Sequence, residues 1–81
     1  MTLQEFRLPD LGEGLLEAEI VRWMVSVGDE VAVDQPVVEV ETAKAAVVVP
    51  SPYAGVVVAQ HAAEGGTVAV NRPLITIRSR A

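Results

Sequence analysis

The chain has 81 residues, of which 51% are hydrophobic and 21% charged, with no cysteine and a net charge of −5. A chain of this size forms one small core and cannot easily enclose a deep substrate cavity, so a function at the surface is expected. The missing cysteines and the single histidine, His61, exclude disulfides, thiol nucleophiles and Cys or His metal cages, and the negative charge argues against nucleic acid or membrane partners.

Valine is the most informative residue of the composition, because sixteen residues are Val and only Phe6, Trp23 and Tyr53 are aromatic. Small β-branched side chains suit pleated sheets, and Gly and Pro mark the breaks between strands. We therefore expect an all-β domain in which two four-stranded antiparallel sheets form a sandwich. The expected strands are Glu5–Leu8, Ile20–Val27, Val31–Val33, Val37–Glu41, Ala46–Val49, Val56–His61, Thr67–Val70 and Leu74–Arg78.

An internal repeat indicates two similar halves. When the sequence is shifted by 37 positions, Ile20–Thr42 lies over Val57–Ser79, and Gly and Pro residues coincide. Further upstream, Pro9–Gly14 matches Pro50–Gly55 at a shift of 41, which predicts four extra residues in a loop around Leu11–Ala18. Two units are too few for a solenoid, so we expect the halves to face each other about a pseudo-two-fold axis.

Two short features have more than one interpretation. Gly12-Glu13-Gly14 could begin a dinucleotide-binding glycine pattern, but the third glycine and a following helix signal are missing, which favours a loop. His61 could act as a base, but its repeat partner is Met24, which favours a partly buried structural position. Neither feature forms a catalytic constellation.

The segment Thr42–Ala45 connects two expected strands and contains Lys44, the only lysine of the chain. Its central residues, Ala43 and Lys44, are not the Gly or Asn that two-residue hairpin turns prefer. A short helix over Glu39–Ala46 is the alternative, because Glu, Ala and Lys favour helices. The β-branched residues on both sides favour the hairpin. An unfavourable turn that displays a single lysine is either a functional site or an ordinary exposed loop tip.

Three segments carry a family resemblance: Val38–Ala45 reads VEVETAKA, Leu8–Gly14 reads LPDLGEG and Pro50–Gly55 reads PSPYAG. Together with Gly28-Asp29-Glu30-Val31 and the following Gln35-Pro36-Val37, they resemble the lipoyl domains of 2-oxo acid dehydrogenase complexes. The resemblance covers essentially the whole chain. It departs from the family at Ala43, where the family most often has Asp.

The resemblance implies a flattened β-barrel of two quasi-symmetric halves, with lipoic acid in amide linkage to Lys44 at a hairpin tip. It implies a swinging-arm carrier. A thiamine-dependent 2-oxo acid dehydrogenase would reductively acylate the lipoyl group, which would carry the acyl group to coenzyme A in the acyltransferase core of the same chain. A flavin-dependent dihydrolipoamide dehydrogenase would reoxidise it, and a lipoyl-attaching enzyme would install it. The domain itself would be the non-catalytic, monomeric carrier part of a dihydrolipoamide acyltransferase.

The resemblance also implies roles for the neighbours of Lys44. Residues that support the attachment turn would be Glu41, Thr42, Ala43, Ala45, Gly28 and Gly55. Residues that the dehydrogenase recognises would be Leu11, Gly12, Glu13, Gly14, Leu15 and Glu17. Because Ala43 replaces the usual Asp, Glu39 and Glu41 are expected to supply the local negative charge. No metal site and no catalytic residue is expected.

Residues 1–79 are expected to form the carrier domain, and residues 80–81 to begin a linker. The start of the chain has no signal-peptide pattern and no apolar run is long enough to span a membrane, so a cytoplasmic location is expected. The resemblance of Leu11–Gly14 favours a branched-chain or pyruvate complex. Two alternatives stay open, namely the biotinyl carrier domain of a carboxylase, whose lysine usually has Met on both sides, and an unmodified β-sandwich interaction domain.

Overall fold

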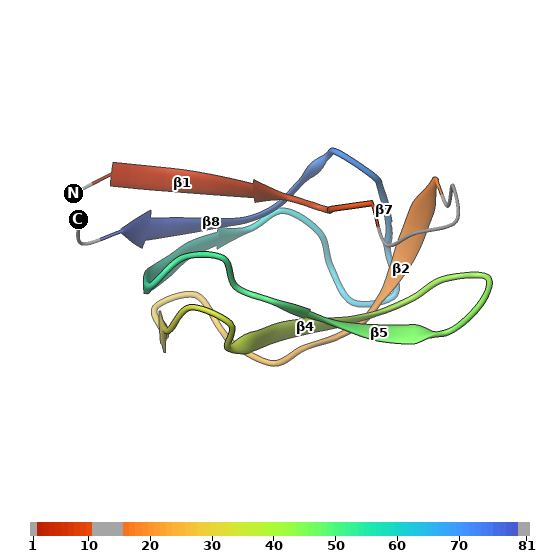
Figure 1. The fold of residues 1–81 in the computed structure, drawn as a ribbon, viewed down its shortest axis with the longest axis horizontal. Helices are drawn as coiled ribbons and strands as arrows, with labels where there is room; N and C mark the ends of the chain where they lie inside the picture. The colour runs from red at the N-terminus through yellow and green to blue at the C-terminus, as the bar shows by residue number, and fades with distance from the viewer. Residues whose placement is uncertain (1, 11–15, 80–81) are drawn as a thin grey trace.

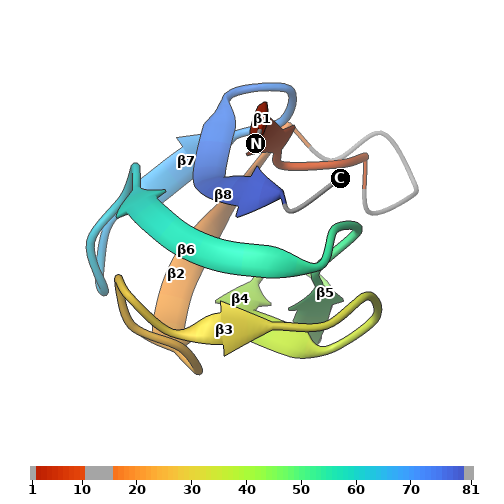
Figure 2. The same ribbon diagram turned by 90° about the vertical axis from the view of Figure 1, so that its left-hand side faces the viewer.

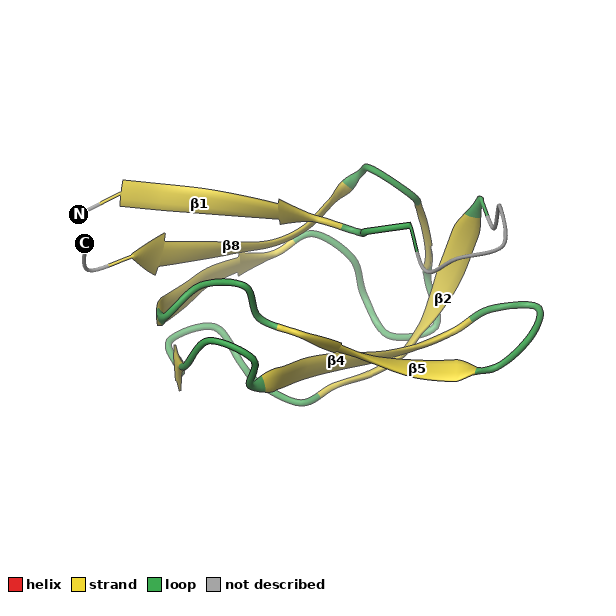
Figure 3. Ribbon diagram, in the orientation of Figure 1, coloured by secondary structure: helices red, strands yellow, loops and turns green. Residues whose placement is uncertain are grey.

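The computed structural model describes residues 2–10 and 16–79, and these residues form strands and loops without a helix (Figure 3). Within these ranges there is accordingly no helix that could cross a membrane. The strands are β1 (Thr2–Arg7), β2 (Glu17–Trp23), β3 (Glu30–Val31), β4 (Pro36–Glu41), β5 (Ala46–Pro50), β6 (Gly55–Gln60), β7 (Thr67–Ala69) and β8 (Pro73–Ser79).

The strands form two antiparallel sheets that pack face to face (Figure 1). One sheet has the order β1-β8-β6-β3 and the other the order β5-β4-β2-β7. The predicted all-β class and each of the expected strands are confirmed, with shifts at the strand ends. The largest shift is in β2, which was expected over Ile20–Val27. It begins at Glu17 because residues 17–19 pair with β7, and it ends at Trp23 before a turn in which the Asp29 amide donates to the Ser26 carbonyl.

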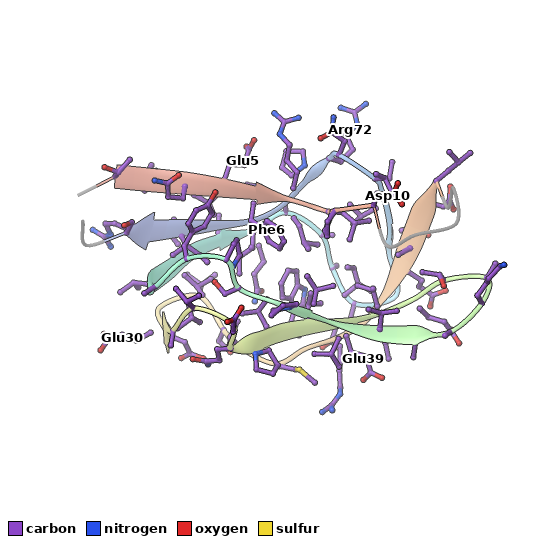
Figure 4. The ribbon with its side chains drawn as sticks, in the orientation of Figure 1. Glu5, Phe6, Asp10, Glu30, Glu39 and Arg72 are labelled. Atoms are coloured by element: carbon purple, nitrogen blue, oxygen red, sulfur yellow. The ribbon has the colours of Figure 1, made fainter. Side chains whose placement is uncertain are left out.

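The core lies between the two sheets, which curve around it when viewed along the long axis (Figure 2). Alternation along the strands decides which side chains enter it. On β2, for example, Ala18 and Ile20 are buried. Figure 4 shows Phe6 between the sheets, with Glu5 and Glu39 pointing outward from opposite layers. The largest fully buried side chains are Leu8, Ile20, Leu74, Ile75, Ile77, Val37, Val38, Val40, Val49, Val57 and Ser51.

The 37-residue repeat is visible in the backbone angles. Gly28 and Gly65 both have positive φ values, of 98° and 85°. Asp34 and Asn71 are the two described non-glycine residues with positive φ, at 68° and 72°. Asp and Asn tolerate this left-handed region because their short polar side chains can bond locally. The same unusual backbone conformation therefore occurs at equivalent positions of the two halves.

The two halves also form equivalent backbone hydrogen bonds with each other. The Gly28 amide donates to the Val57 carbonyl and the Gly65 amide donates to the Ile20 carbonyl, each at 2.8 Å. The register shifts directly after Ile20 in β2 and directly after Val57 in β6, so both halves have the same irregularity. The expected pseudo-two-fold arrangement is thus present at the level of single hydrogen bonds.

The upstream part of the repeat differs from the prediction. The Leu8 amide donates to the Arg72 carbonyl at 2.9 Å, as the Ser51 amide donates to the Gln35 carbonyl at 2.8 Å. Leu8 is therefore the equivalent of Ser51, at a shift of 43 rather than 41. Since the shift after the loop is 37, the first half has six extra residues, and the prediction of four is wrong.

The repeat also explains where the turn between β4 and β5 lies. The last pair of that hairpin is Glu41 with Ala46, and its equivalent in the other half is Leu3 with Arg78. The turn thus occupies the place where the other half has the start of β1 and the end of β8. In Figure 1 those strand ends lie at one end of the 36 Å long molecule and the β4–β5 turn at the opposite end.

Candidate functional site

The turn at residues 42–45 is a four-residue hairpin loop that contains Lys44. β4 ends at Glu41 and β5 begins at Ala46, so the alternative of a short helix over Glu39–Ala46 is wrong. None of the four loop residues has a positive φ. The primed two-residue turns that require Gly or Asn are therefore not used here, which explains how Ala43 and Lys44 can stand at the tip.

The Thr42 side chain closes the turn. Its hydroxyl donates to the Ala45 carbonyl at 3.0 Å and accepts from the amides of Lys44 and Ala45, each at 3.2 Å. The Thr42 amide also donates to the Ala45 carbonyl, at 2.9 Å. One side chain thus satisfies the backbone groups on both sides of the lysine, as Ser and Thr do in local turns.

The turn presents an amine between two small neighbours. Ala43, Lys44 and Ala45 are all exposed, and neither alanine adds bulk beyond a methyl group beside the lysine. The one hydroxyl of the turn, on Thr42, is engaged with the backbone. A primary amine on a long flexible side chain is suited to an amide bond with a carboxylic acid, so Lys44 fits a covalently attached carboxylic acid cofactor. The turn contains no second reactive group that would make it a catalytic centre.

A shallow groove of about 590 Å³ lies beside the turn. Glu19 on β2 is the direct cross-strand partner of Glu41 on β4, and Glu17 lies two residues before Glu19 on β2. The groove is therefore acidic. Its lining residues are Leu16, Glu17, Ala18, Glu19, Glu41, Thr42, Ala43 and Thr67.

Sequence reasoning singled out Glu17 and Glu41 here but missed Glu19 and Thr67. The signal for Glu19 was available, because Glu17 and Glu19 flank a buried Ala18 and alternate onto the outer face of one strand. Thr67 joins the groove through the pairing of β2 with β7, which no local pattern reveals.

Not all of the expected site residues gather at the turn. The loop residues Leu11, Gly12, Glu13, Gly14 and Leu15 lie outside the described residues, whereas Glu17 lines the groove. Gly28 and Gly55 are placed elsewhere: Gly28 bonds to Val57, and Gly55 pairs with Val31 and Ser79. Ser79 is the last residue of β8, and Figure 1 shows that end of β8 at the end of the molecule opposite the β4–β5 turn, so Gly55 is not part of the lysine turn. Gly28 is bonded to the same strand as Gly55, namely β6, so both glycines shape the scaffold.

His61 is exposed rather than partly buried, which corrects the expectation from its repeat partner Met24. Its Nε2 lies 2.6 Å from the Thr76 hydroxyl oxygen, on the other sheet from the lysine turn. Within residues 2–10 and 16–79 there is no group of three or more His, Cys, Asp or Glu residues that could hold a metal ion.

Comparison with known sequences gives a family match and several relatives. Residues 4–77 match a family model described as "Biotin-requiring enzyme". The chain is 46% identical over 77 residues to the dihydrolipoyllysine-residue succinyltransferase component of the 2-oxoglutarate dehydrogenase complex of Bartonella vinsonii subsp. berkhoffii, which covers 95% of this chain and 19% of that protein.

Relatives from two other complexes are equally similar. The chain is 46% identical over 71 residues to the lipoamide acyltransferase component of the branched-chain alpha-keto acid dehydrogenase complex of Pseudomonas putida, with 88% of this chain and 17% of that protein covered. It is 46% identical over 72 residues to the dihydrolipoyllysine-residue acetyltransferase component of the pyruvate dehydrogenase complex of Bacillus subtilis, with 89% and 16% covered. The chain spans less than a fifth of the length of these relatives.

Two solved structures share the fold. The lipoyl domain of the 2-oxoglutarate dehydrogenase complex from Azotobacter vinelandii superposes with a TM-score of 0.76 at 23% identity, over 95% of this chain and 98% of that one. A single-chain, multi-domain long-chain acyl-CoA carboxylase superposes with a TM-score of 0.78 at 19% identity, over 98% of this chain and 7% of that one. At such identities the likeness concerns the fold alone.

Proposed function

The chain belongs to the family of biotin- and lipoyl-attachment domains and is a lipoyl domain of the kind found in 2-oxo acid dehydrogenase acyltransferases, and from this premise we propose that Lys44 is the residue that carries lipoic acid. The observation that carries the proposal is the position of the only lysine of the chain. It is exposed in a turn that the Thr42 hydroxyl closes, and this turn lies at the far end of the molecule from the start of β1 and the end of β8.

The residues of this chain would hold and present the cofactor. When bound, the lipoyl group supplies a dithiolane, which provides the redox and acyl-transfer chemistry that no side chain of this domain offers. The turn holds the backbone of Lys44 at the tip of the β4–β5 hairpin. The small side chains of Ala43 and Ala45 leave space for an enzyme to approach Lys44. Tethering the cofactor to a mobile domain raises its effective concentration at each active site.

The partners proposed for the domain follow from its family. They are a lipoyl-attaching enzyme, a thiamine-dependent 2-oxo acid dehydrogenase, a flavin-dependent dihydrolipoamide dehydrogenase and the acyltransferase core of its own chain. We place residues 1–79 in the carrier domain and residues 80–81 in a linker, with the complex in the cytoplasm. Identities of 46% to relatives from three complexes do not select a substrate, and the LGEG sequence of residues 11–14 favours a branched-chain or pyruvate complex.

The acidic groove is the proposed contact for the thiamine-dependent dehydrogenase, together with residues 11–15. Glu17, Glu19 and Glu41 lie beside the turn, so a basic rim on the dehydrogenase would be steered toward Lys44. Glu41 and Glu19 also supply negative charge near the lysine, where Ala43 has none, whereas Glu39, which was expected to contribute, is ion-paired with Arg22 at 3.0 Å and does not line the groove.

The alternative function is that of a biotinyl carrier in a carboxylase. The fold alone permits it, since a carboxylase domain superposes as well as a lipoyl domain does. The residues beside the lysine argue against it, because Ala43 and Ala45 replace the Met residues that usually flank a biotinyl lysine.

The experiment that tests the function is reductive acylation. The modified domain is incubated with a thiamine-dependent dehydrogenase and its 2-oxo acid, in turn for pyruvate, branched-chain and 2-oxoglutarate enzymes, and its mass is followed. We expect the wild-type domain to gain an acyl group with a branched-chain or pyruvate enzyme and Lys44→Arg to gain none. A domain that no dehydrogenase acylates would contradict the proposal, and acylation by the 2-oxoglutarate enzyme alone would contradict the substrate assignment.

A further inference from the structure

The Thr42 hydroxyl stands where a backbone carbonyl would stand in the tightest hairpins. In two-residue hairpin loops the residues that flank the loop bond to each other through their backbones, and the loop residues need positive φ. Here the Ala45 amide donates to the Thr42 hydroxyl oxygen at 3.2 Å. The tip can therefore close around Ala43 and Lys44 without the left-handed backbone that both residues resist.

The same hydroxyl acts directly on the lysine. The Lys44 amide donates to it at 3.2 Å, and it donates in turn to the Ala45 carbonyl at 3.0 Å. Thr42 therefore contacts the backbone immediately before and after the Lys44 side chain. It is half-buried, whereas Ala43, Lys44 and Ala45 are exposed. Its three hydrogen bonds thus restrain the backbone of the turn and leave the lysine accessible.

We propose that Thr42 is a positioning residue for the modification of Lys44, whose hydroxyl holds the turn in the one conformation that the lipoyl-attaching enzyme binds. This inference rests on the proposed function, in which Lys44 is the attachment residue. Without the hydroxyl the loop samples other conformations, and only a fraction of the molecules presents a competent tip. The apparent affinity for the attaching enzyme falls by that fraction, whereas catalysis within the bound complex is unchanged.

The size of the effect follows from the contacts. Losing one or two hydrogen bonds changes a conformational equilibrium by about 5- to 30-fold. We expect the KM of the attaching enzyme for Thr42→Val to rise as the competent fraction of molecules falls, by at most about 30-fold, with kcat unchanged. Valine keeps the β-branched shape and removes the hydroxyl, whereas Thr42→Ser keeps the hydroxyl and should retain the wild-type KM.

The experiment compares wild type, Thr42→Val, Thr42→Ser and the matched control Thr76→Val. Thr76 also uses its hydroxyl in one contact, with His61, but lies on the other sheet. The first readout is amide hydrogen exchange at Lys44 and Ala45 in the unmodified domain, which needs no cofactor. The second is the steady-state rate of attachment, followed by intact mass over a range of domain concentrations. Circular dichroism confirms that each variant is folded.

The expected result is a loss of protection at Lys44 and Ala45 by about 5- to 30-fold in Thr42→Val, with a rise in KM that does not exceed this factor, and wild-type values for Thr42→Ser and Thr76→Val. Unchanged exchange in Thr42→Val, or an equal rise in KM for Thr76→Val, would overturn the inference. If Thr42→Val does not fold, Thr42→Ala provides the same comparison. A wild-type domain that is not modified would instead contradict the proposed function. The hydrogen-exchange measurement tests the role of the Thr42 hydroxyl independently, because it uses the unmodified domain.

Discussion

Glu19 and Glu41 face each other as direct cross-strand partners on β2 and β4, at the edge of the groove beside the lysine turn. Like charges directly opposite in an antiparallel pair are destabilising. Both side chains are exposed, which moderates the repulsion without removing it. The arrangement therefore has a cost in folding stability, and both carboxylates line the groove proposed as the contact for the dehydrogenase.

Glu19→Arg should therefore stabilise the domain. It replaces a repulsion by an attraction to Glu41, and we expect a gain of about 0.5 to 1 kcal/mol in the free energy of unfolding, measured by urea denaturation. The matched control is Glu17→Arg, which makes the same change of net charge opposite Ala69. Equal gains from the two variants would assign the effect to overall charge and contradict the pairwise account. The difference between them should shrink in high salt.

Neutralising Glu17 should weaken reductive acylation without affecting attachment of the cofactor. Glu17 lines the groove but is not part of the turn, so Glu17→Gln is expected to lower kcat/KM with the cognate dehydrogenase by roughly 2- to 10-fold, an effect that fades with added salt. Glu5→Gln on the opposite sheet is the control. An unchanged kcat/KM for Glu17→Gln would contradict the proposal that the dehydrogenase recognises Glu17.

Among the four glycines that the structure describes, Gly55 should be the one at which alanine is most damaging. A Cβ at this position would overlap the Arg78 carbonyl oxygen, which is backbone and cannot move aside. We expect a loss of about 2 to 3 kcal/mol, seen as a lower Tm. Gly65→Ala is the comparison, because a Cβ there meets no atom within 4 Å and only its φ of 85° opposes the change, at about 1 kcal/mol. Equal losses would show that the close approach to Arg78 does not limit position 55.

The left-handed residues of the repeat make a further prediction. Asn71 has a φ of 72°, which alanine resists more than asparagine does. Asn71→Ala is expected to lower the free energy of unfolding by about 1 kcal/mol, whereas Asn71→Gly changes it by only a few tenths. Urea denaturation of both variants provides the measurement. If alanine and glycine are equivalent at position 71, backbone strain is not what selects Asn there.

The fold class and the strands could be predicted because local signals agreed with one another. The Val-rich segments are interrupted by Gly and Pro at intervals that fit short strands, and the pairs Gly28 with Gly65 and Pro36 with Pro73 revealed the repeat. The sequence predicted that the lysine turn is a hairpin, but it did not predict which hydrogen bonds close the turn. The resemblance implied that Thr42 supports the turn, but a hydroxyl that replaces a backbone acceptor leaves no periodic pattern, so its hydrogen bonds were evident only in the structure.

The errors had physical causes. The shift of 41 relied on Pro and Gly, which recur in loops for local reasons, whereas hydrogen bonds of Leu8 and Ser51 define the true equivalence. Glu19 was missed because its meeting with Glu41 depends on strand register. Gly28 and Gly55 flank the lysine in sequence, but Gly28 bonds to Val57 and Gly55 pairs with Val31 and Ser79, which are contacts of the β6 sheet and not of the turn.

The most direct test of the central claim is the mass of the domain produced in a host supplied with both lipoate and biotin, followed by peptide mapping. We expect a single lipoyl adduct on the peptide that contains Lys44, and no adduct on Lys44→Arg. A biotinyl adduct at Lys44, or an unmodified wild-type domain under conditions that modify a control lipoyl domain, would contradict the account.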